Sequence, residues 1–333
     1  MDGPAPIREE AGPRELVGVL GPNKEEMPRC GRKPLGDKHH YIPKFYLKQW
    51  AGADGRLCEF SRPYNAPPSQ MPDWRHIPVR PRRVHPDGTG YERGLYTFDE
   101  LPPVIANYIE YRFLQRADDL AYATLRKLLD GDLKLNQNEQ SAWSRFIISL
   151  VHRSPEGIAR LKLRFGTEFR TEVEAFRGDY DARRTEGMPT FDEFIDNLST
   201  ADLQRMNVQV LQRVMDSQFL GAHLNSMRWT IVRFDETHRP LLTGDRPIVM
   251  TNGLNKEDSH LVLPISPKVL FLAANDQRQI DSVLQMAESA GLAQRMNNRI
   301  ARQARKYVYA IGDAPLAFVA QRLGEKASWS PFE

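Results

Sequence analysis

The apolar residues in the first half of the chain recur with the period of an α-helix. From about 101 onward they return every three or four positions, and Gly131 supplies a stop. The members of this stripe are Ile105, Ile109, Phe113, Ala117, Leu120, Ala121, Leu125 and Leu128. Asn136, followed three residues later by Glu139, has the spacing of a capping box and predicts the start of a second helix. Its buried face should contain Trp143, Phe146, Ile147, Leu150 and Val151. We expect that face to cover the helix of residues 103–130, because the connection is short.

Further helices are predicted up to residue 227. Ser154-Pro155 should end the second helix and begin a third, since proline at the first helical position loses no hydrogen bond. The charged stretch 170–188 is expected to be a loop. Thr190 and Glu193 should cap a short helix, and one long helix is expected over 201–227.

After Trp229 the pattern changes to short apolar runs bounded by turn residues, which is typical of strands. The expected strands are 229–234, 241–242, 248–250, 261–265, 269–273 and 307–311, with helices at 279–305 and 314–323. One earlier strand is expected at 57–61. This layout predicts the α+β class: a helical first half packed on a strand-rich C-terminal part, with an extended Pro-rich N-terminal segment.

The composition shifts predict the domain organisation. Residues 1–36 contain six prolines and little periodicity, so they are expected to form a flexible or surface-laid arm. Residues 37–325 are expected to form a single α+β domain. Within it, 37–100 should be an extended basic and aromatic segment, 101–227 helical, and 228–325 strand-rich with helices.

Composition excludes several classes of protein. The 333 residues are 41% hydrophobic and 27% charged, as in globular proteins, and the formal net charge is only +3. Cys30 and Cys58 are too few and too far apart for a disulfide framework or a thiolate zinc site. No long apolar run and no basic-then-apolar N-terminus is present, so the sequence predicts no membrane association and a cytoplasmic location.

The most specific motif is Lys38-His-His-Tyr-Ile-Pro-Lys-Phe-Tyr-Leu-Lys-Gln-Trp50. It resembles the start of bacterial proteins catalogued as domain of unknown function 4238. The resemblance continues at Leu95-Tyr96-Thr97, Arg153-Ser154-Pro155, Thr243-Gly-Asp-Arg-Pro247 and Leu263-Pro-Ile-Ser-Pro267, and so spans roughly 38–312. It implies no established activity. Similar sequences often have an acidic residue in the helix after the tyrosine motif, where this chain has Asp118 and Asp119.

Two histidines open this motif. Side chains alternate along an extended segment, so His39 and His40 should point to opposite sides and not bind one ion together. We expect His40 to face inward with Ile42, as a general base, a metal ligand or a hydrogen-bonded structural histidine.

Asp245 lies in a loop between two expected strands, where it is either a site residue or a turn former that bonds its own backbone. Together His40, Asp118 and Asp245 would form a mixed nitrogen and oxygen set suited to Mg, Mn or Zn, provided that distant segments bring them together. Arg153, at a helix end, would complement the helix dipole, or would reach an anionic ligand or Asp245 as a buried ion pair. No phosphate loop, dinucleotide fingerprint, serine-hydrolase elbow or H-E-x-x-H string is present.

Positive charge gathers between residues 28 and 83, where twelve Lys or Arg face four Asp or Glu among several aromatic residues. Such a composition suits phosphate contact and base stacking, and Arg80, Arg82 and Arg83 are its densest cluster. Arg295, Arg299, Arg302 and Lys306 form a second basic line at helical spacing. A solvated surface is the alternative for both.

Two functions therefore stay open. The leading hypothesis is a metal-assisted phosphodiester hydrolase such as a nuclease, with His40 as ligand or base, Asp118 and Asp245 as ligands, and Arg153 steadying negative charge. The other is a non-catalytic module that binds nucleic acid or a protein through the segment 28–83, with the polar motifs serving the structure.

Overall fold

The computed structural model describes residues 38–63, 76–96, 114–251, 253–288 and 291–326. The N-terminal arm 1–36 and the first part of the helix expected over 103–130 lie outside these residues. From Gln115 onward that helix is α4 (Gln115–Asp130), and it ends where Gly131 adopts a left-handed φ of 81°. Ala117, Ala121, Leu125 and Leu128 are buried as expected, whereas Leu120 is 47% exposed and was wrongly assigned to the core stripe.

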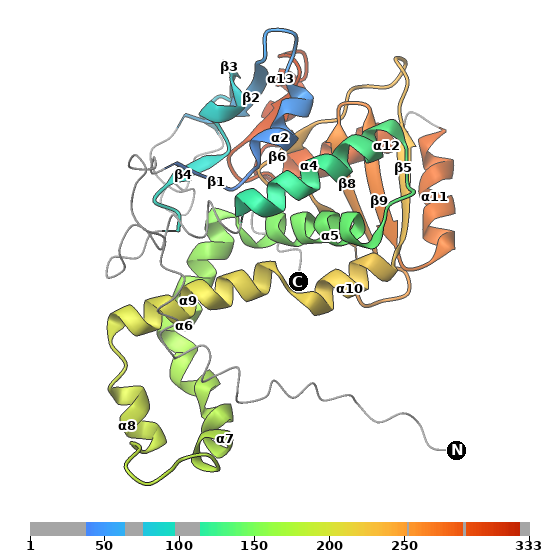
Figure 1. Cartoon of the computed structure of the whole chain (residues 1–333). Helices are drawn as coiled ribbons and strands as arrows, with labels where there is room; N and C mark the ends of the chain where they lie inside the picture. The colour runs from blue at the N-terminus through green and yellow to red at the C-terminus, as the bar shows by residue number, and fades with distance from the viewer. Residues whose placement is uncertain (1–37, 64–75, 97–113, 252, 289–290, 327–333) are drawn as a thin grey trace, which may run out of the picture.

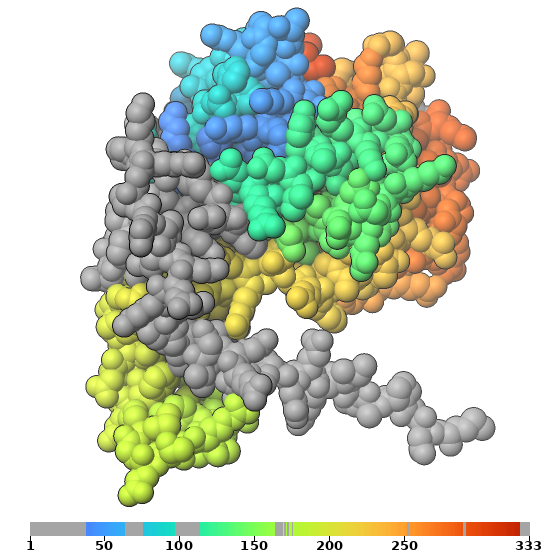
Figure 2. All heavy atoms as spheres, in the orientation of Figure 1, coloured from blue at the N-terminus to red at the C-terminus, as the bar shows by residue number. Residues whose placement is uncertain are grey.

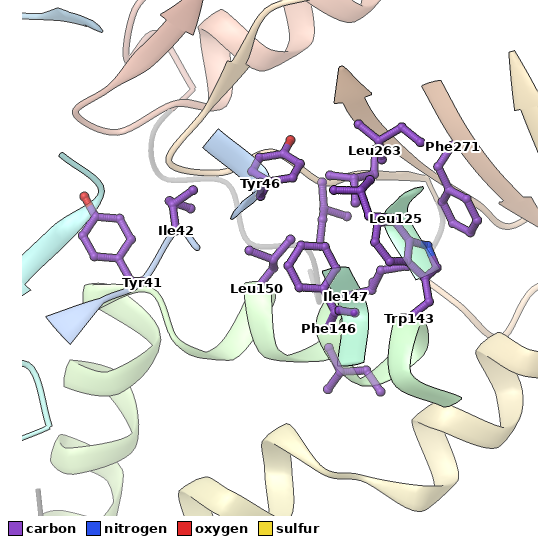
Figure 3. Packing of buried hydrophobic residues seen from close by; sticks show 14 of the residues in the cluster. Tyr41, Ile42, Tyr46, Leu125, Trp143, Phe146, Ile147, Leu150, Leu263 and Phe271 are labelled. Carbon is purple, nitrogen blue, oxygen red and sulfur yellow. The ribbon is translucent and has the colours of Figure 1, made fainter. Parts of the chain in front are cut away.

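Helix α5 (Gln137–His152) begins at Asn136 with the predicted capping box. The core residues predicted for it are buried at Trp143, Phe146, Ile147 and Leu150, while Val151 is half-buried. Their rings and chains contact α4, the tyrosine motif and the sheet behind, as Figure 3 shows for Trp143, Phe146 and Phe271. The prediction of this helical pair is confirmed.

The next helices differ from the prediction in two places. Helix α6 (Pro155–Val173) starts at the Ser154 cap as expected, but it continues through η6 (Glu174–Phe176) into α7 (Arg177–Asp181), so the predicted loop 170–188 is wrong over its first half. The predicted long helix is divided into α9 (Thr200–Met215) and α10 (Gln218–Ser226), because the Ser217 side chain accepts the Leu220 N–H and starts a new helix. Helix α8 (Phe191–Asp196) has the predicted Thr190 cap.

The strands of the described residues lie in three sheets. The order β5-β9-β8-β7 makes one antiparallel sheet from β5 (Arg228–Arg233), β7 (Val249–Thr251), β8 (His260–Ser266) and β9 (Val269–Ala274). The order β3-β2-β10-β6 makes a second from β2 (Leu57–Ser61), β3 (Arg80–Val84), β6 (Thr243–Gly244) and β10 (Val308–Ala310). The third is a pair of β1 (Lys38–His40) and β4 (Tyr91–Arg93). The strand expected at 241–242 is displaced to Thr243–Gly244.

The sheets have helices on both sides, with a separate apolar core on each side. One core joins α4 and α5 to residues such as Leu263 and Phe271 of the sheet, and includes Tyr46 and Trp50 (Figures 1 and 3). The other lies between the opposite sheet faces and the C-terminal helices α11 (Gln277–Ala287) and α12 (Gly291–Gln303). Helix α13 (Leu316–Ala320) closes that side. The α+β class is confirmed.

The described part of the segment 37–100 contributes strands to the sheets. Strand β2 pairs antiparallel with β10, so Phe60 stands opposite Val308 although the two residues lie near opposite ends of the described chain. The short helix α2 (Lys44–Leu47) and η1 (Lys48–Trp50) carry the tyrosine motif into the first core. In Figures 1 and 2, α7 and α8 form a projection away from this body. No helix in the described part of the chain is long and apolar enough to cross a membrane.

Candidate functional site

Tyr46 connects three of the sequence motifs. Its buried hydroxyl donates to the Pro264 carbonyl at 2.7 Å and accepts from the Thr243 hydroxyl at 2.7 Å. Trp50, from the same motif, donates its indole N–H to the Leu241 carbonyl at 2.8 Å. The first motif is thereby bonded to the loop before β6 and to strand β8. We call Tyr46, Thr243, Asp245 and Pro264 the motif junction.

Asp245 holds the chain that enters β10. Its carboxylate accepts the backbone N–H groups of Arg305, Lys306 and Tyr307 at 2.9, 2.6 and 3.0 Å, and its own N–H donates to the Tyr307 carbonyl. Burial raises the pKa of Asp245, and the three N–H donors oppose that rise by favouring the carboxylate. Gly244 is needed beside it, because a Cβ there would lie 2.9 Å from the Tyr307 carbonyl oxygen. Asp245 is thus engaged in backbone bonds on both oxygens.

Arg246, the next residue of that loop, reaches the start of α6. Its Nη2 lies 3.7 Å from Glu156, and Glu156 also forms an ion pair with Arg305. The Arg153-Ser-Pro155 motif and the Thr243–Pro247 motif therefore meet at Glu156. Burial lowers the pKa of Arg246, and nearby Arg160 adds to that effect while Asp245 opposes it.

Of the two histidines of the first motif, His39 is the more fully buried. His39 is 1% exposed; its Nδ1 accepts the Tyr96 N–H at 3.1 Å and its ring stacks on Tyr96 at 5.1 Å. His40 is half-buried, with its ring 5.5 Å from that of Tyr91. Its pKa is lowered to about 4, first by burial and then by the positive charge of Lys44. The prediction that His40 faces inward holds only in part: its Nε2 atom is buried, while the side chain as a whole is half-buried. The chain bends at Tyr41 and Ile42, so the simple alternation expected of an extended segment ends at His40.

The buried Arg153 forms its ion pair with Asp118, and the expected alternative, a pair with Asp245, is wrong because the Asp245 carboxylate is bonded to backbone N–H groups. The Arg153 side chain is 0% exposed, and its Nη1 lies 3.1 Å from Oδ1 of Asp118. Burial raises the pKa of Asp118, and Arg153 opposes that rise. Nε and Nη2 of Arg153 are buried without a hydrogen-bond partner in the described part of the chain. These two groups form one edge of the guanidinium plane, which is the edge that binds a carboxylate or phosphate through two parallel bonds. The neighbouring Asp119 is exposed.

The predicted metal ligands are not gathered. Asp118 lies with Arg153, Asp245 with the backbone before β10, and His40 in the β1–β4 pair. Among the residues that the structure describes, no three His, Cys, Asp or Glu side chains are placed to hold one metal ion. Metal binding by these three residues therefore has no geometric support here.

A buried polar row was missed by the sequence analysis. Glu59 of β2, 1% exposed, accepts from Arg82 at 3.0 Å and from the Thr89 hydroxyl, which also hydrogen-bonds the Tyr309 hydroxyl at 2.9 Å. Arg82, Glu59 and Tyr309 stand directly opposite one another on three adjacent strands. The alternation of residues 57–61, which places Glu59 with Leu57, was the signal that could have found this glutamate.

The basic cluster lies on the edge strand β3. Arg80, Arg82 and Arg83 are exposed, and β3 has a sheet neighbour only at β2 among the described residues. The Nη2 group of Arg83 lies 2.7 and 2.8 Å from the two carboxylate oxygens of Asp54, and Arg82 pairs with Glu59, so two of the three arginines have acidic neighbours. We call these three arginines the basic edge.

Comparison with known proteins gives a family but no activity. No curated protein and no solved structure matches the chain. A family model described as "Protein of unknown function (DUF4238)" matches residues 38–312, which contain every motif that meets at the motif junction. That match covers most of the chain and agrees with the resemblance seen in the motifs, so the protein belongs to the DUF4238 family.

Proposed function

We propose that the protein is a non-catalytic binding module that engages nucleic acid through the basic edge. The observation that carries this proposal is the exposure of Arg80, Arg82 and Arg83 on an edge strand, with the Arg82 side chain 61% exposed and that of Arg83 40% exposed. Within 38–63 and 76–96, nine Lys or Arg are present against four Asp or Glu. Basic side chains on an open strand suit contact with phosphates.

The polar motifs support a structural role beside this surface. Tyr46 and Asp245 each satisfy several buried groups at once, and their partners come from segments far away in the sequence. Side chains used in this way hold the loops in position. The chemistry offered to a partner then lies on the exposed arginines.

The test is binding of a short duplex or single strand at several salt concentrations. Reversal of Arg80, Arg82 and Arg83 to Glu should weaken binding by about tenfold or more at low salt, because bound phosphates release counterions. The salt slope should fall by about one for each arginine that no longer pairs with a phosphate. Reversal of Arg116, Arg126 and Arg213, which are exposed on helices, is a control with the same change in charge.

The helix variant and the folding control distinguish the possible explanations of a loss of binding. Retention on a polyanion column should be lost in the β3 variant and kept in the helix variant, with both variants folded by circular dichroism. Equal retention of parent and β3 variant would remove the basic edge from consideration and favour a protein partner. Equal loss of retention in both variants would mean that binding depends on net charge alone and not on the position of the arginines.

A second candidate, metal-assisted phosphodiester hydrolysis, is favoured by one observation. The open edge of the Arg153 guanidinium is buried beside Asp118, and a phosphate oxygen pair is a group that such an edge binds. In this candidate Arg153 holds negative charge, and His40, Asp118 and Asp245 serve a divalent Mg, Mn or Zn ion after rearrangement.

The hydrolase candidate predicts that site variants lose activity while their stability stays close to that of the parent. His40→Gln and Asp245→Asn should then melt within a few degrees of the parent, lose metal-dependent cleavage, and lose any thermal stabilisation by the metal. The absence of a thermal shift with Mg, Mn or Zn in the parent, together with strong destabilisation by Asp245→Asn, would reject this candidate.

A further inference from the structure

A cavity of about 540 Å³ lies between helix α12, the loop before β6 and the chain that follows β10. Its walls are mostly apolar, and its apolar side chains include Leu242, Ala310, Ile311, Ala317 and Phe318. Arg239, Gln294 and Asn297 add polar groups. Cavities of about 300–1,000 Å³ with apolar walls and a few convergent polar groups are typical of small-molecule sites.

Two sets of contacts fix the walls of this cavity. The Asn297 amide accepts the Leu242 N–H at 2.7 Å and donates to the Pro240 carbonyl at 2.9 Å, which ties the loop to α12. The ring of Phe318, which also lines the cavity, has the Arg322 guanidinium carbon 4.0 Å from its centroid. Arg322 is itself held by Asn298 at 2.8 Å. A ligand would therefore enter a site whose walls are already ordered, which lowers the cost of binding.

The charge of the site indicates the class of ligand. Among the described residues that line the cavity, Arg239 alone carries a formal charge. Arg239 and Gln294 are exposed, and neither side chain is hydrogen-bonded within the part of the chain that the structure describes. One arginine balances one negative charge, whereas a phosphate monoester would bring close to two. A carboxylate also matches the planar guanidinium through two parallel bonds.

We infer that this cavity binds a small carboxylic acid with an aromatic or aliphatic body. The carboxylate pairs with Arg239 at the polar side, and the body lies against Ala317 and Phe318. This inference is independent of nucleic-acid binding, because Arg239 and the basic edge are different groups. The Arg83 guanidinium donates to the Ile311 carbonyl, which places one wall of the cavity next to β3.

Calorimetric titration of the full chain with phenylbutyrate and with phenylbutanol tests the inference. The two probes share the aromatic body and differ in charge, so the acid should bind more tightly to the parent. Arg239→Gln should weaken binding of the acid by about tenfold or more and leave the alcohol unchanged, since a charge-assisted pair is lost. Ala317→Trp, which fills the cavity, should weaken both probes.

Arg228→Gln is the matched control, because Arg228 is exposed on β5 and does not line the cavity. It should bind both probes like the parent. Failure of the parent to bind phenylbutyrate at millimolar concentration would overturn the inference. Equal affinity for acid and alcohol, or no effect of Arg239→Gln in a variant that melts like the parent, would do so as well.

Discussion

The motif junction and the basic edge use charged and polar side chains in opposite settings. At the junction, Asp245 is 6% exposed and accepts three backbone N–H groups at fixed positions. At the edge, the Arg83 side chain is 40% exposed and pairs with Asp54, whose side chain is 53% exposed. Removing the partner of a buried polar group lowers the free energy of unfolding strongly, because the group is left without a hydrogen bond. Removing one member of an exposed ion pair lowers it little, because water replaces the partner. The same residue types are therefore structural at one place and available for binding at the other.

The largest expected effect concerns the core on which the junction rests. The Phe146 ring is 0% exposed and lies 6.1 Å from the Tyr46 ring and 4.9 Å from that of Trp143. Phe146→Ala should lower the free energy of unfolding by about 3–5 kcal/mol, because it removes buried surface and leaves a cavity. Urea unfolding measures this. Phe219→Ala, at a residue 66% exposed, is the control and should change little.

Next in size is the loss of the Asp245 carboxylate. Asp245→Ala would leave three backbone N–H groups without their acceptor, and each buried unsatisfied donor costs about 1–3 kcal/mol. We expect a loss of about 3 kcal/mol or more in urea unfolding. A variant as stable as the parent would show that this carboxylate does not hold the junction together. The proposed difference between a structural junction and an exposed basic edge would then be wrong.

The sequence predicted the helical pair well, since both helices carry local signals. The capping box at Asn136 and the stop at Gly131 depend on neighbours in the chain, and the structure has both. Leu120 was misassigned because helical spacing alone does not say how wide the covered face is. The break at Ser217 was missed because a serine cap inside an apolar pattern gives a weak signal.

The site was harder to predict, because its contacts join segments far apart in the chain. The family motifs correctly indicated which segments matter, but not that Tyr46 bonds Thr243 or that Asp245 bonds the chain before β10. The relative burial of His39 and His40 was not predicted, because the extended segment ends at His40 and the chain bends at Tyr41 and Ile42. The place of Glu59 in a buried polar row could be recognised only from its cross-strand neighbours Arg82 and Tyr309.

The pH dependence of stability tests whether His40 and His152 are uncharged in the folded protein. Burial lowers the pKa of both His40 and His152 from 6.5 to about 4, so the unfolded chain binds more protons between these pH values. Stability should therefore fall as the pH drops from 6.5 to 4, by at most about 1.4 kcal/mol per pH unit for each histidine. His40→Gln and His152→Gln should each make this dependence shallower. Unchanged slopes in urea unfolding at several pH values would contradict the buried neutral state.

Tyr46→Phe should have a smaller effect than the loss of Asp245. The change keeps the ring in the core and removes only the hydroxyl that bonds Thr243 and Pro264. We expect a loss of about 1–2 kcal/mol, the cost of leaving buried partners unpaired. A double variant with Thr243→Val should lose less than the sum of the two single changes, because the partner that Phe leaves unsatisfied is then absent.

The smallest effect on stability is expected at the basic edge itself. Arg83→Ala removes an exposed pair with Asp54 and an exposed hydrogen bond to the Ile311 carbonyl. Exposed pairs contribute about 0–1 kcal/mol because solvent screens both charges, so the total effect should be small. Burial of Glu59 makes Arg82 different, so Arg82→Ala should cost more than Arg83→Ala although both arginines belong to one strand. Urea unfolding in low and high salt measures both variants, and salt should reduce the smaller effect further. An Arg83→Ala variant as unstable as Asp245→Ala would mean that the edge is built into the fold, and that its arginines are not free to bind phosphate.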